Sequence, residues 1–261
     1  LTGITLGGGL AGKIAANRDR AATAFAVTQL AIAGLSMAVY RWMGPLIPAT
    51  LSAQSLALYA VAVLLPATLF IGATFPLAVR ILARDESEAS PVTARIYAWN
   101  TVGAIAGAVL AGFVLIPALG FEGSIKAAVL VNVLLALWTT AFVMRASPAF
   151  IGFCTAALVS LAVIYQPSRP QAVVSSSGFA LEFHVAPQEI FYSVGRSATV
   201  MALEEDGRYF LRTNGLPEAT ITARGGVPAQ DPEKWLTALP AVARPDARSM
   251  LVVGLGGGVA L

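Results

Sequence analysis

A run of glycines follows a short apolar stretch near the end of the sequence. Gly254, Gly256, Gly257 and Gly258 come after Met250–Val253, and this order predicts a buried strand that leads into a glycine-rich turn. Glycine lets the backbone turn tightly, approach a ligand closely and direct amide N–H groups at it. The pattern is therefore typical of the first turn of a nucleotide-type cofactor site, and a tight loop without a ligand is the alternative.

The other residues with reactive side chains indicate no metal centre. His184 alternates with Glu182 on a predicted strand and has no neighbouring set of ligands, which favours a histidine on a sheet face. Cys154 is the only cysteine and lies in an apolar run, so a disulfide within the chain is excluded and an inert thiol is expected. The acidic cluster Glu204–Asp206 is expected to be a solvated turn, with a polyamine contact as the alternative.

Composition places at least part of the chain in a membrane. Apolar residues make up 57% of the sequence, charged residues 12%, and the mean hydropathy is +0.74, whereas soluble domains carry about 25% charged residues. The net charge of +3 comes largely from loops that flank apolar segments, which favours a role in membrane orientation over nucleic-acid binding. Residues 1–165 hold nine basic and five acidic residues and the remainder eight and nine, so a boundary is expected after Tyr165.

Six apolar segments are long enough, or nearly so, to cross a bilayer, which takes roughly 20 residues. The first begins abruptly at an apolar leucine, so we interpret both ends of the chain as truncated. Glycines spaced four residues apart, Gly8 with Gly12 and Gly103 with Gly107, would allow helices to approach closely, and a homo-oligomer stays an open alternative. The segments are Leu1–Ala16, Ala21–Met43, Leu56–Leu82, Ile96–Pro117, Ser124–Met144 and Pro148–Tyr165.

The third segment contains Pro66, Gly72 and Pro76. Such an interruption is either a tolerated kink or, in a transporter, a binding site. Arg80 lies near a helix end, where its side chain can extend to the interface. No acidic residue lies near the middle of any segment, so no proton relay or coupling-ion ligand is evident.

Basic residues in the loops predict the orientation of the segments in a bacterial-type inner (plasma) membrane. If the segments alternate, most of these residues share one face, and that face should be cytoplasmic. A sixth crossing at Pro148–Tyr165 would then carry the polar half to the opposite side, whereas a soluble cofactor favours the cytoplasm, so the side of the polar half stays open. The shared face holds Lys13, Arg18, Arg20, Arg80, Arg84, Arg95 and Arg145, and the other holds Arg41 and Lys126.

The polar half changes to the period of β-strands. Asp206-Gly207 and Asn214-Gly215 are dipeptides suited to tight hairpins, and Asp231–Ala243 is expected to form a helix capped by Asp231. We therefore expect a transmembrane helical domain over 1–165, a β-hairpin domain over 166–230 and the start of a Rossmann-like α/β domain of methyltransferase type over 231–261. The predicted strands are Leu181–Val185, Ile190–Val194, Ala198–Glu204, Tyr209–Thr213, Glu218–Thr222 and Met250–Val253.

Several runs of residues, in this order, resemble one family. Phe191–Val200, Thr213–Ala219 and Leu251–Gly258 resemble the N-terminal hairpin domain and first nucleotide motif of the spermidine synthase family. In the membrane half, three runs resemble the multi-pass portion of membrane-fused spermidine synthase-like proteins. These runs are Gly12–Arg20, Gly72–Leu77 and Asn100–Gly107.

This resemblance implies a site for S-adenosylmethionine or its decarboxylated form. Gly254, Gly256, Gly257 and Gly258 would bind the cofactor, and aminopropyl transfer to a polyamine is the family's reference activity. Gly257 stands where the family has an acidic residue, which puts a polyamine substrate in doubt. The resemblance places the catalytic carboxylate beyond Leu261, and it places Tyr192, Asn214 and Glu218 at the substrate cleft.

Two classes of function follow. The first is a membrane-bound transferase of spermidine-synthase type that acts on a polyamine or another small molecule. The second is a transporter or membrane scaffold that carries a catalytically degenerate module of the same type. The lack of acidic residues within the apolar segments weighs against ion-coupled transport, and Gly257 weighs against the family's ordinary catalysis.

Overall fold

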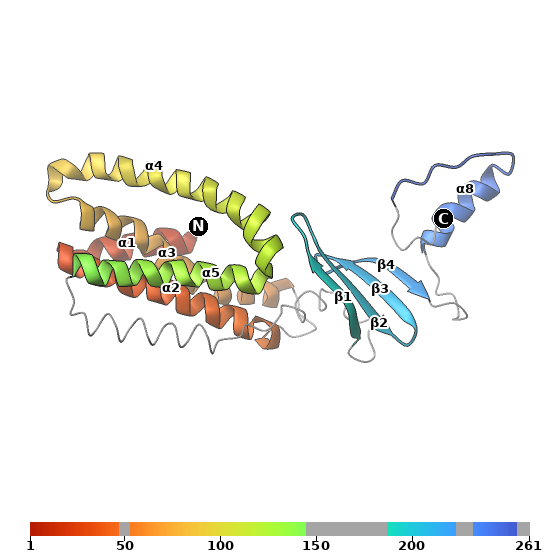
Figure 1. Cartoon of the computed structure of the whole chain (residues 1–261), viewed down its shortest axis with the longest axis horizontal. Helices are drawn as coiled ribbons and strands as arrows, with labels where there is room; N and C mark the ends of the chain where they lie inside the picture. Colours follow the sequence, from red (N-terminus) through yellow and green to blue (C-terminus); the bar gives the residue numbers. More distant parts are fainter. Residues whose placement is uncertain (47–52, 145–186, 223–231, 255–261) are drawn as a thin grey trace. The chain divides into compact units, whose positions relative to one another are not determined.

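A computed structural model describes residues 1–46, 53–144, 187–222 and 232–254, and the chain divides into two units (Figure 1). The division falls between Pro170 and Gln171. In the described residues, the first unit is helical and the second consists of an antiparallel sheet and one helix.

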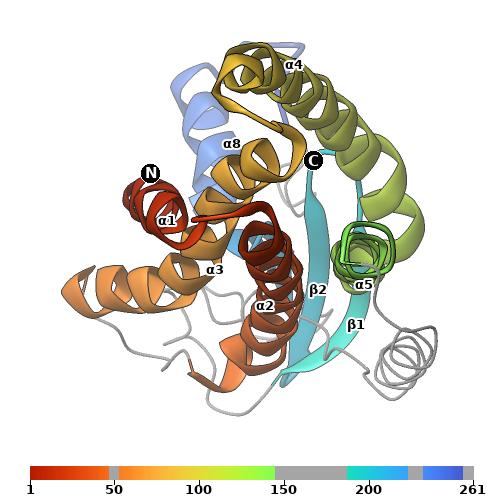
Figure 2. The same cartoon turned by 90° about the vertical axis from the view of Figure 1, so that its left-hand side faces the viewer.

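The described residues of the first unit form five α-helices and two short π-helical turns. Polar side chains set two of the helix starts, because Asn17 Oδ1 accepts a hydrogen bond from the N–H of Arg20 at 2.8 Å and Asp85 Oδ1 accepts one from the N–H of Glu88 at 3.0 Å. The elements are α1 (Thr2–Ile14), α2 (Arg18–Leu46), α3 (Ala53–Leu82), α4 (Glu86–Leu110), η1 (Ala111–Leu115), α5 (Ile116–Trp138) and η2 (Thr139–Val143). Seen end-on in Figure 2, α3 lies beside both α1 and α2, and α5 lies beside α2.

Three helical stretches among the described residues are long and apolar enough to cross a membrane: Arg18–Arg41, Ala57–Leu82 and Ser87–Val143. The third has 57 residues, about twice the number that a tilted crossing needs. Gly120, within α5, breaks it with a φ of 69° and a ψ of −175°, and Figure 1 shows α4 and α5 running in opposite directions. This reversal separates the predicted segments Ile96–Pro117 and Ser124–Met144. The predicted segment Pro148–Tyr165 lies outside the described residues.

Glycines bring α1 and α3 into backbone contact. A Cβ at Gly7 would overlap the carbonyl group of Leu69, and a Cβ at Gly72 would overlap the backbone of Ile4. A Cβ at Gly3 would overlap the side chain of Thr68. The buried face of α1 is therefore Gly3, Gly7 and Ala11, which recur every four residues.

The glycine pairs that the sequence predicted do not make this contact. A Cβ at Gly8 would lie 3.6 Å from the Gly72 carbonyl oxygen, which is ordinary contact, and a Cβ at Gly12, Gly103 or Gly107 would meet no described atom within 4 Å. The four-residue spacing does recur at the contact between α1 and α3, but on a neighbouring face of α1. Neighbouring helical residues point about 100° apart, so an error of one position selects a different face.

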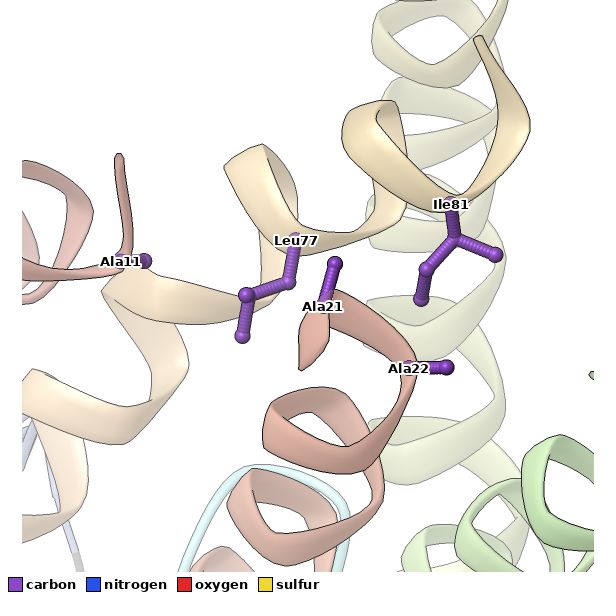
Figure 3. Close-up of a cluster of buried hydrophobic side chains, with 5 residues drawn as sticks. All are labelled: Ala11, Ala21, Ala22, Leu77 and Ile81. Carbon is purple, nitrogen blue, oxygen red and sulfur yellow. The ribbon is translucent and has the colours of Figure 1, made fainter. Parts of the chain in front are cut away.

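Small residues also form the core where α1, α2 and α3 meet (Figure 3). Leu77 of α3 is 1% exposed, and it lies close to Ala21 of α2. Ala11, Ala22 and Ile81 complete this cluster of buried side chains. Because alanine fills little volume, the three helices can approach closely enough to enclose the larger leucine.

The second unit contains a four-stranded antiparallel sheet with the order β1-β2-β3-β4. Asp206 and Gly207 join β2 to β3 with φ angles of 49° and 74°, and Asn214 and Gly215 join β3 to β4 with φ angles of 53° and 83°. Paired positive φ angles are those of tight type I′ turns, so both predicted hairpins are confirmed. The strands are β1 (Gln188–Val194), β2 (Thr199–Glu205), β3 (Arg208–Thr213) and β4 (Leu216–Thr222).

One face of this sheet holds a small apolar core. Met201, Leu203 and Phe210 are buried, and Tyr192 packs against them. Arg212 is 1% exposed and pairs with Met201 across the sheet. Its Nη1 donates a hydrogen bond to the Gly215 carbonyl oxygen at 3.3 Å, which ties this buried guanidinium to the β3–β4 turn.

The C-terminal part agrees with the sequence only in its helix. Helix α8 (Pro232–Ala243) forms as expected. The structure does not show the predicted strand Met250–Val253, and Leu251 and Val253 are 86% and 91% exposed. A strand is stabilised by the ladder to its neighbour, and no described strand pairs with this stretch. The Rossmann-like domain therefore remains an expectation. The predicted strand Leu181–Val185 and the helix cap Asp231 lie outside the described residues.

Candidate functional site

The three predicted substrate-cleft residues occupy different parts of the sheet. Tyr192 lies on β1, Glu218 on β4 and Asn214 in the turn between β3 and β4. Neighbouring strands are about 4.8 Å apart, which puts the two edge strands β1 and β4 roughly 14 Å from each other. The sheet by itself does not bring Tyr192 and Glu218 together, and their roles at a substrate remain predictions.

Asn214 closes the β3–β4 turn. Its side-chain Oδ1 accepts a hydrogen bond from the Thr199 N–H at 2.9 Å, and its own N–H donates to the Thr199 carbonyl oxygen at 2.8 Å. These bonds join the turn to the start of β2. The side chain of Asn214 therefore has a structural task, independent of any ligand.

Tyr192 and Glu218 differ in their surroundings. The Tyr192 ring packs against the buried cluster of Met201, Leu203 and Phe210. Glu218 is exposed, and the register places it between Pro217 and Ala219 as the extra residue of a β-bulge. Of the three residues, only Glu218 presents a charged group that a soluble ligand could reach from an edge strand.

The glycine run is described only at its first member. Gly254 has a φ of 100°, a backbone conformation that residues with a side chain rarely adopt. It is exposed, and a Cβ placed on it would meet no described atom within 4 Å. The backbone at Gly254 is thus open to close approach. Gly256, Gly257 and Gly258 lie outside the described residues.

A second candidate site lies in the helical unit, where two short connections bring charged residues to one end. Arg18 Nε, at the start of α2, donates a hydrogen bond to the Ile81 carbonyl oxygen at 3.1 Å. Arg80 Nη2, near the end of α3, donates to the Ala16 carbonyl oxygen at 3.2 Å. Arg18 thus satisfies a carbonyl group at the end of α3, and Arg80 satisfies one in the connection between α1 and α2. We call this part of the bundle the arginine end.

A pocket of about 410 Å³ opens at the arginine end between α1, α3 and the start of α4. Phe75, Pro76 and Val79 of α3 supply apolar walls, and Gly12 at the end of α1 supplies a wall without a side chain. Arg80 and Asp85 line the same pocket. The cavity therefore combines apolar surface with one positive and one negative group.

Asp85 is held as a carboxylate. The Ser87 hydroxyl and the Glu88 N–H both donate hydrogen bonds to its Oδ1. These bonds favour the charged form, the Ser87 bond most, and hold the pKa of Asp85 below its usual value of 3.8. The side chain is thus negative at neutral pH and faces solvent.

Arg80 and Asp85 do not neutralise each other. No ion pair joins them, although both line the pocket, and the hydrogen bonds of each are to other groups in the described part of the chain. The guanidinium of Arg80 has five N–H donors, and its described hydrogen bond uses one nitrogen. A ligand that carries both signs of charge could bridge them.

The sequence patterns do not predict this pocket, but they contain a signal for part of it. Asp85 and Glu88 stand three residues apart before a helix, which is the spacing of a capping box. In the structure, Glu88 Oε2 accepts from the Arg84 N–H at 2.9 Å. The spacing would have placed the helix start, but only the fold shows that Asp85 shares a cavity with Arg80.

The described residues contain no group of three or more histidine, cysteine or acidic side chains that could hold a metal ion. His184 and Cys154 lie outside that part of the chain. Comparison of the chain with protein-family models, with curated proteins and with solved structures finds no match.

Proposed function

We propose that this chain is part of a membrane-bound transferase of spermidine-synthase type, which binds S-adenosylmethionine or its decarboxylated form at the turn that begins at Gly254. The proposal rests on the resemblance of the ordered sequence runs, with aminopropyl transfer to a polyamine as the reference reaction. Glu218 would meet the cationic substrate.

The observation that carries the proposal is the backbone at Gly254. Gly254 has a positive φ, is exposed and has open space at its Cβ position. A turn whose backbone lies close to a phosphate or ribose group requires these properties. The tight turn between β3 and β4 supports the same proposal, because Asn214 and Gly215 lie within the run Thr213–Ala219 that resembles the family's hairpin domain.

The test is isothermal titration of the full-length protein in detergent with S-adenosylmethionine and with its decarboxylated form. We expect one of the two to bind with a Kd in the micromolar range. The Gly254→Val variant should raise that Kd at least tenfold, because a β-branched side chain is strained at this φ and blocks the approach to the backbone.

Gly207→Asn is the matched control. Gly207 also has a positive φ, of 74°, but it lies in the β2–β3 turn, where asparagine is compatible with that angle. The control should bind the cofactor with a Kd within twofold of the unmodified protein. If neither cofactor binds the unmodified protein, the transferase proposal is wrong and the scaffold alternative gains support.

The membrane location is tested separately. The three helical stretches that are apolar enough to cross a bilayer support a multi-pass membrane protein, and we propose that the arginine end faces the cytoplasm. A reporter fused at Arg84 should report a cytoplasmic location. A reporter fused after Tyr165 will show on which side of the membrane the second unit lies. An extracytoplasmic report at Arg84 would reverse the proposed orientation.

A further inference from the structure

The pocket at the arginine end has the features of a site for an amphiphile. Its apolar walls, Phe75, Pro76 and Val79, belong to α3, and this helix is long and apolar enough to cross a bilayer over Ala57–Leu82. Arg80 lies close to the end of that stretch. The end of a crossing helix lies at the depth of lipid head groups, so the charged part of the pocket would meet head groups and the apolar part would meet acyl chains.

The charges of the pocket limit the class of head group. A purely anionic ligand would be attracted by Arg80 but repelled by Asp85. A cation such as a polyamine would be attracted by Asp85 but repelled by Arg80. Asp85 Oδ1 already accepts two hydrogen bonds, whereas Oδ2 accepts none among the described residues. A zwitterion satisfies both groups, with its anionic part on the guanidinium and its cationic part on Oδ2.

We propose that this pocket binds a phospholipid with a primary ammonium head group, whose phosphate pairs with Arg80 and whose ammonium pairs with Asp85. A primary ammonium donates hydrogen bonds to a carboxylate, which a quaternary ammonium does not. The site lies wholly in the helical unit and does not depend on the function proposed for the second unit.

The test is native mass spectrometry of the full-length protein in detergent, titrated with lipids of identical acyl chains. The lipids are phosphatidylethanolamine, phosphatidylglycerol and phosphatidylcholine. We expect phosphatidylethanolamine to bind at least fivefold more tightly than the other two. Equal affinities for phosphatidylethanolamine and phosphatidylglycerol would overturn the proposal.

Two variants assign the groups. Asp85→Ser removes the charge but keeps a favoured helix-capping residue, so α4 should still begin at the same place. We expect it to lose the preference for phosphatidylethanolamine over phosphatidylglycerol. Arg80→Gln should weaken the binding of both lipids at least fivefold, because both carry a phosphate.

Matched controls come from the same end of the bundle. Asp19→Ser and Arg84→Gln remove an exposed acidic and an exposed basic residue that do not line the pocket, and both should leave the lipid preference unchanged. If Asp19→Ser abolishes the preference as fully as Asp85→Ser, the effect belongs to the general charge of this surface and the proposed site is wrong.

A soluble ligand with the same chemistry is distinguished by competition. Free phosphoethanolamine carries the same two charges but no acyl chains. At a concentration equal to that of the lipid it should displace little of the bound phosphatidylethanolamine, because it lacks contact with Phe75 and Val79. Full displacement at that concentration would assign the pocket to a soluble zwitterion and overturn the lipid site.

Discussion

The helical unit and the sheet unit use glycine for opposite reasons. In α1 and α3, Gly7 and Gly72 have ordinary helical backbones, and what matters is that a Cβ would collide with the other helix. In the sheet, Gly207 and Gly215 have positive φ angles that their own turns require. The first requirement comes from a helix far away in the sequence and the second from adjacent residues.

Helix α4 sharpens this comparison, because it carries the same glycine spacing without the contact. Gly103 and Gly107 are exposed, and no described atom would lie within 4 Å of a Cβ on either. The spacing of small residues permits close helix packing, but it does not bring a partner helix to that face.

The largest expected effect is at the contact between α1 and α3. Gly7→Leu and Gly72→Leu should each destabilise the helical unit by about 3 kcal/mol or more, because the new side chain collides with backbone that cannot rotate away. The measurement is the thermal unfolding midpoint of the full-length protein in detergent, with the fraction of monodisperse protein as a second readout.

Gly103→Leu is the control for this prediction. It meets no described neighbour, and leucine has the higher helix propensity by up to about 1 kcal/mol, so the midpoint should stay the same or rise slightly. Equal destabilisation by Gly7→Leu and Gly103→Leu would mean that backbone contact does not distinguish the two helix faces.

A smaller effect is expected in the sheet, where the requirement is local. Asn214→Ala should destabilise the β2–β3–β4 region by about 1–2 kcal/mol, because it loses the hydrogen bond to Thr199 and places alanine at a φ of 53°. Asn214→Gly keeps the angle and loses only the hydrogen bond, so its effect should be smaller. Hydrogen exchange of the β2 and β3 amides in the full-length protein measures both.

Faster exchange confined to these strands would support the division into two independent units. If Asn214→Ala also accelerated exchange in α1 and α3, the turn would be coupled to the helical unit and the comparison would fail.

The smallest effect on stability is expected at Asp85, the exposed N-cap of α4, because it involves only neighbouring residues of the helical unit. Asp85→Asn keeps a capping oxygen but removes the charge that Ser87 and Glu88 stabilise. Because the folded pKa of Asp85 is lowered from 3.8, its stabilisation is present at neutral pH and is lost as the pH falls through that lowered value.

The measurement is hydrogen exchange of the first-turn amides of α4 in both proteins. Unmodified protein should exchange more slowly than Asp85→Asn at pH 6–7, and the difference should vanish well below pH 3.8. A difference that persists unchanged in acid would contradict a contribution from the carboxylate charge.

Local sequence patterns were sufficient for turns and apolar spans. Asp206-Gly207 and Asn214-Gly215 identified both hairpins because a type I′ turn depends on the residues within it. The apolar stretches identified α2 and α3 and separated α4 from α5, although Ala53–Leu82 and Glu86–Leu110 begin earlier than expected. The expected strand Met250–Val253 failed because a strand depends on a partner to pair with, which its own residues do not specify.

The candidate sites divide in the same way. The glycine run could be identified as a candidate from spacing alone, and Gly254 does have a positive φ. Tyr192 packs against the sheet core, and periodicity could not show which face of β1 is covered; its role at a substrate stays a prediction. Arg80 and Asp85 were both visible as charges near helix ends, but nothing in their spacing indicated a common cavity.

By itself, the sequence determined where the chain turns, which stretches are apolar enough to cross a membrane and where a helix such as α4 is capped. These properties depend on a residue and its near neighbours. Only the tertiary structure decided that α3 leaves no room for a Cβ at Gly3 and Gly7, whereas it does at Gly8 and Gly12, and that Arg80 shares a pocket with Asp85. Such contacts depend on the rotation of each helix about its axis, which is set by packing between segments distant in the sequence.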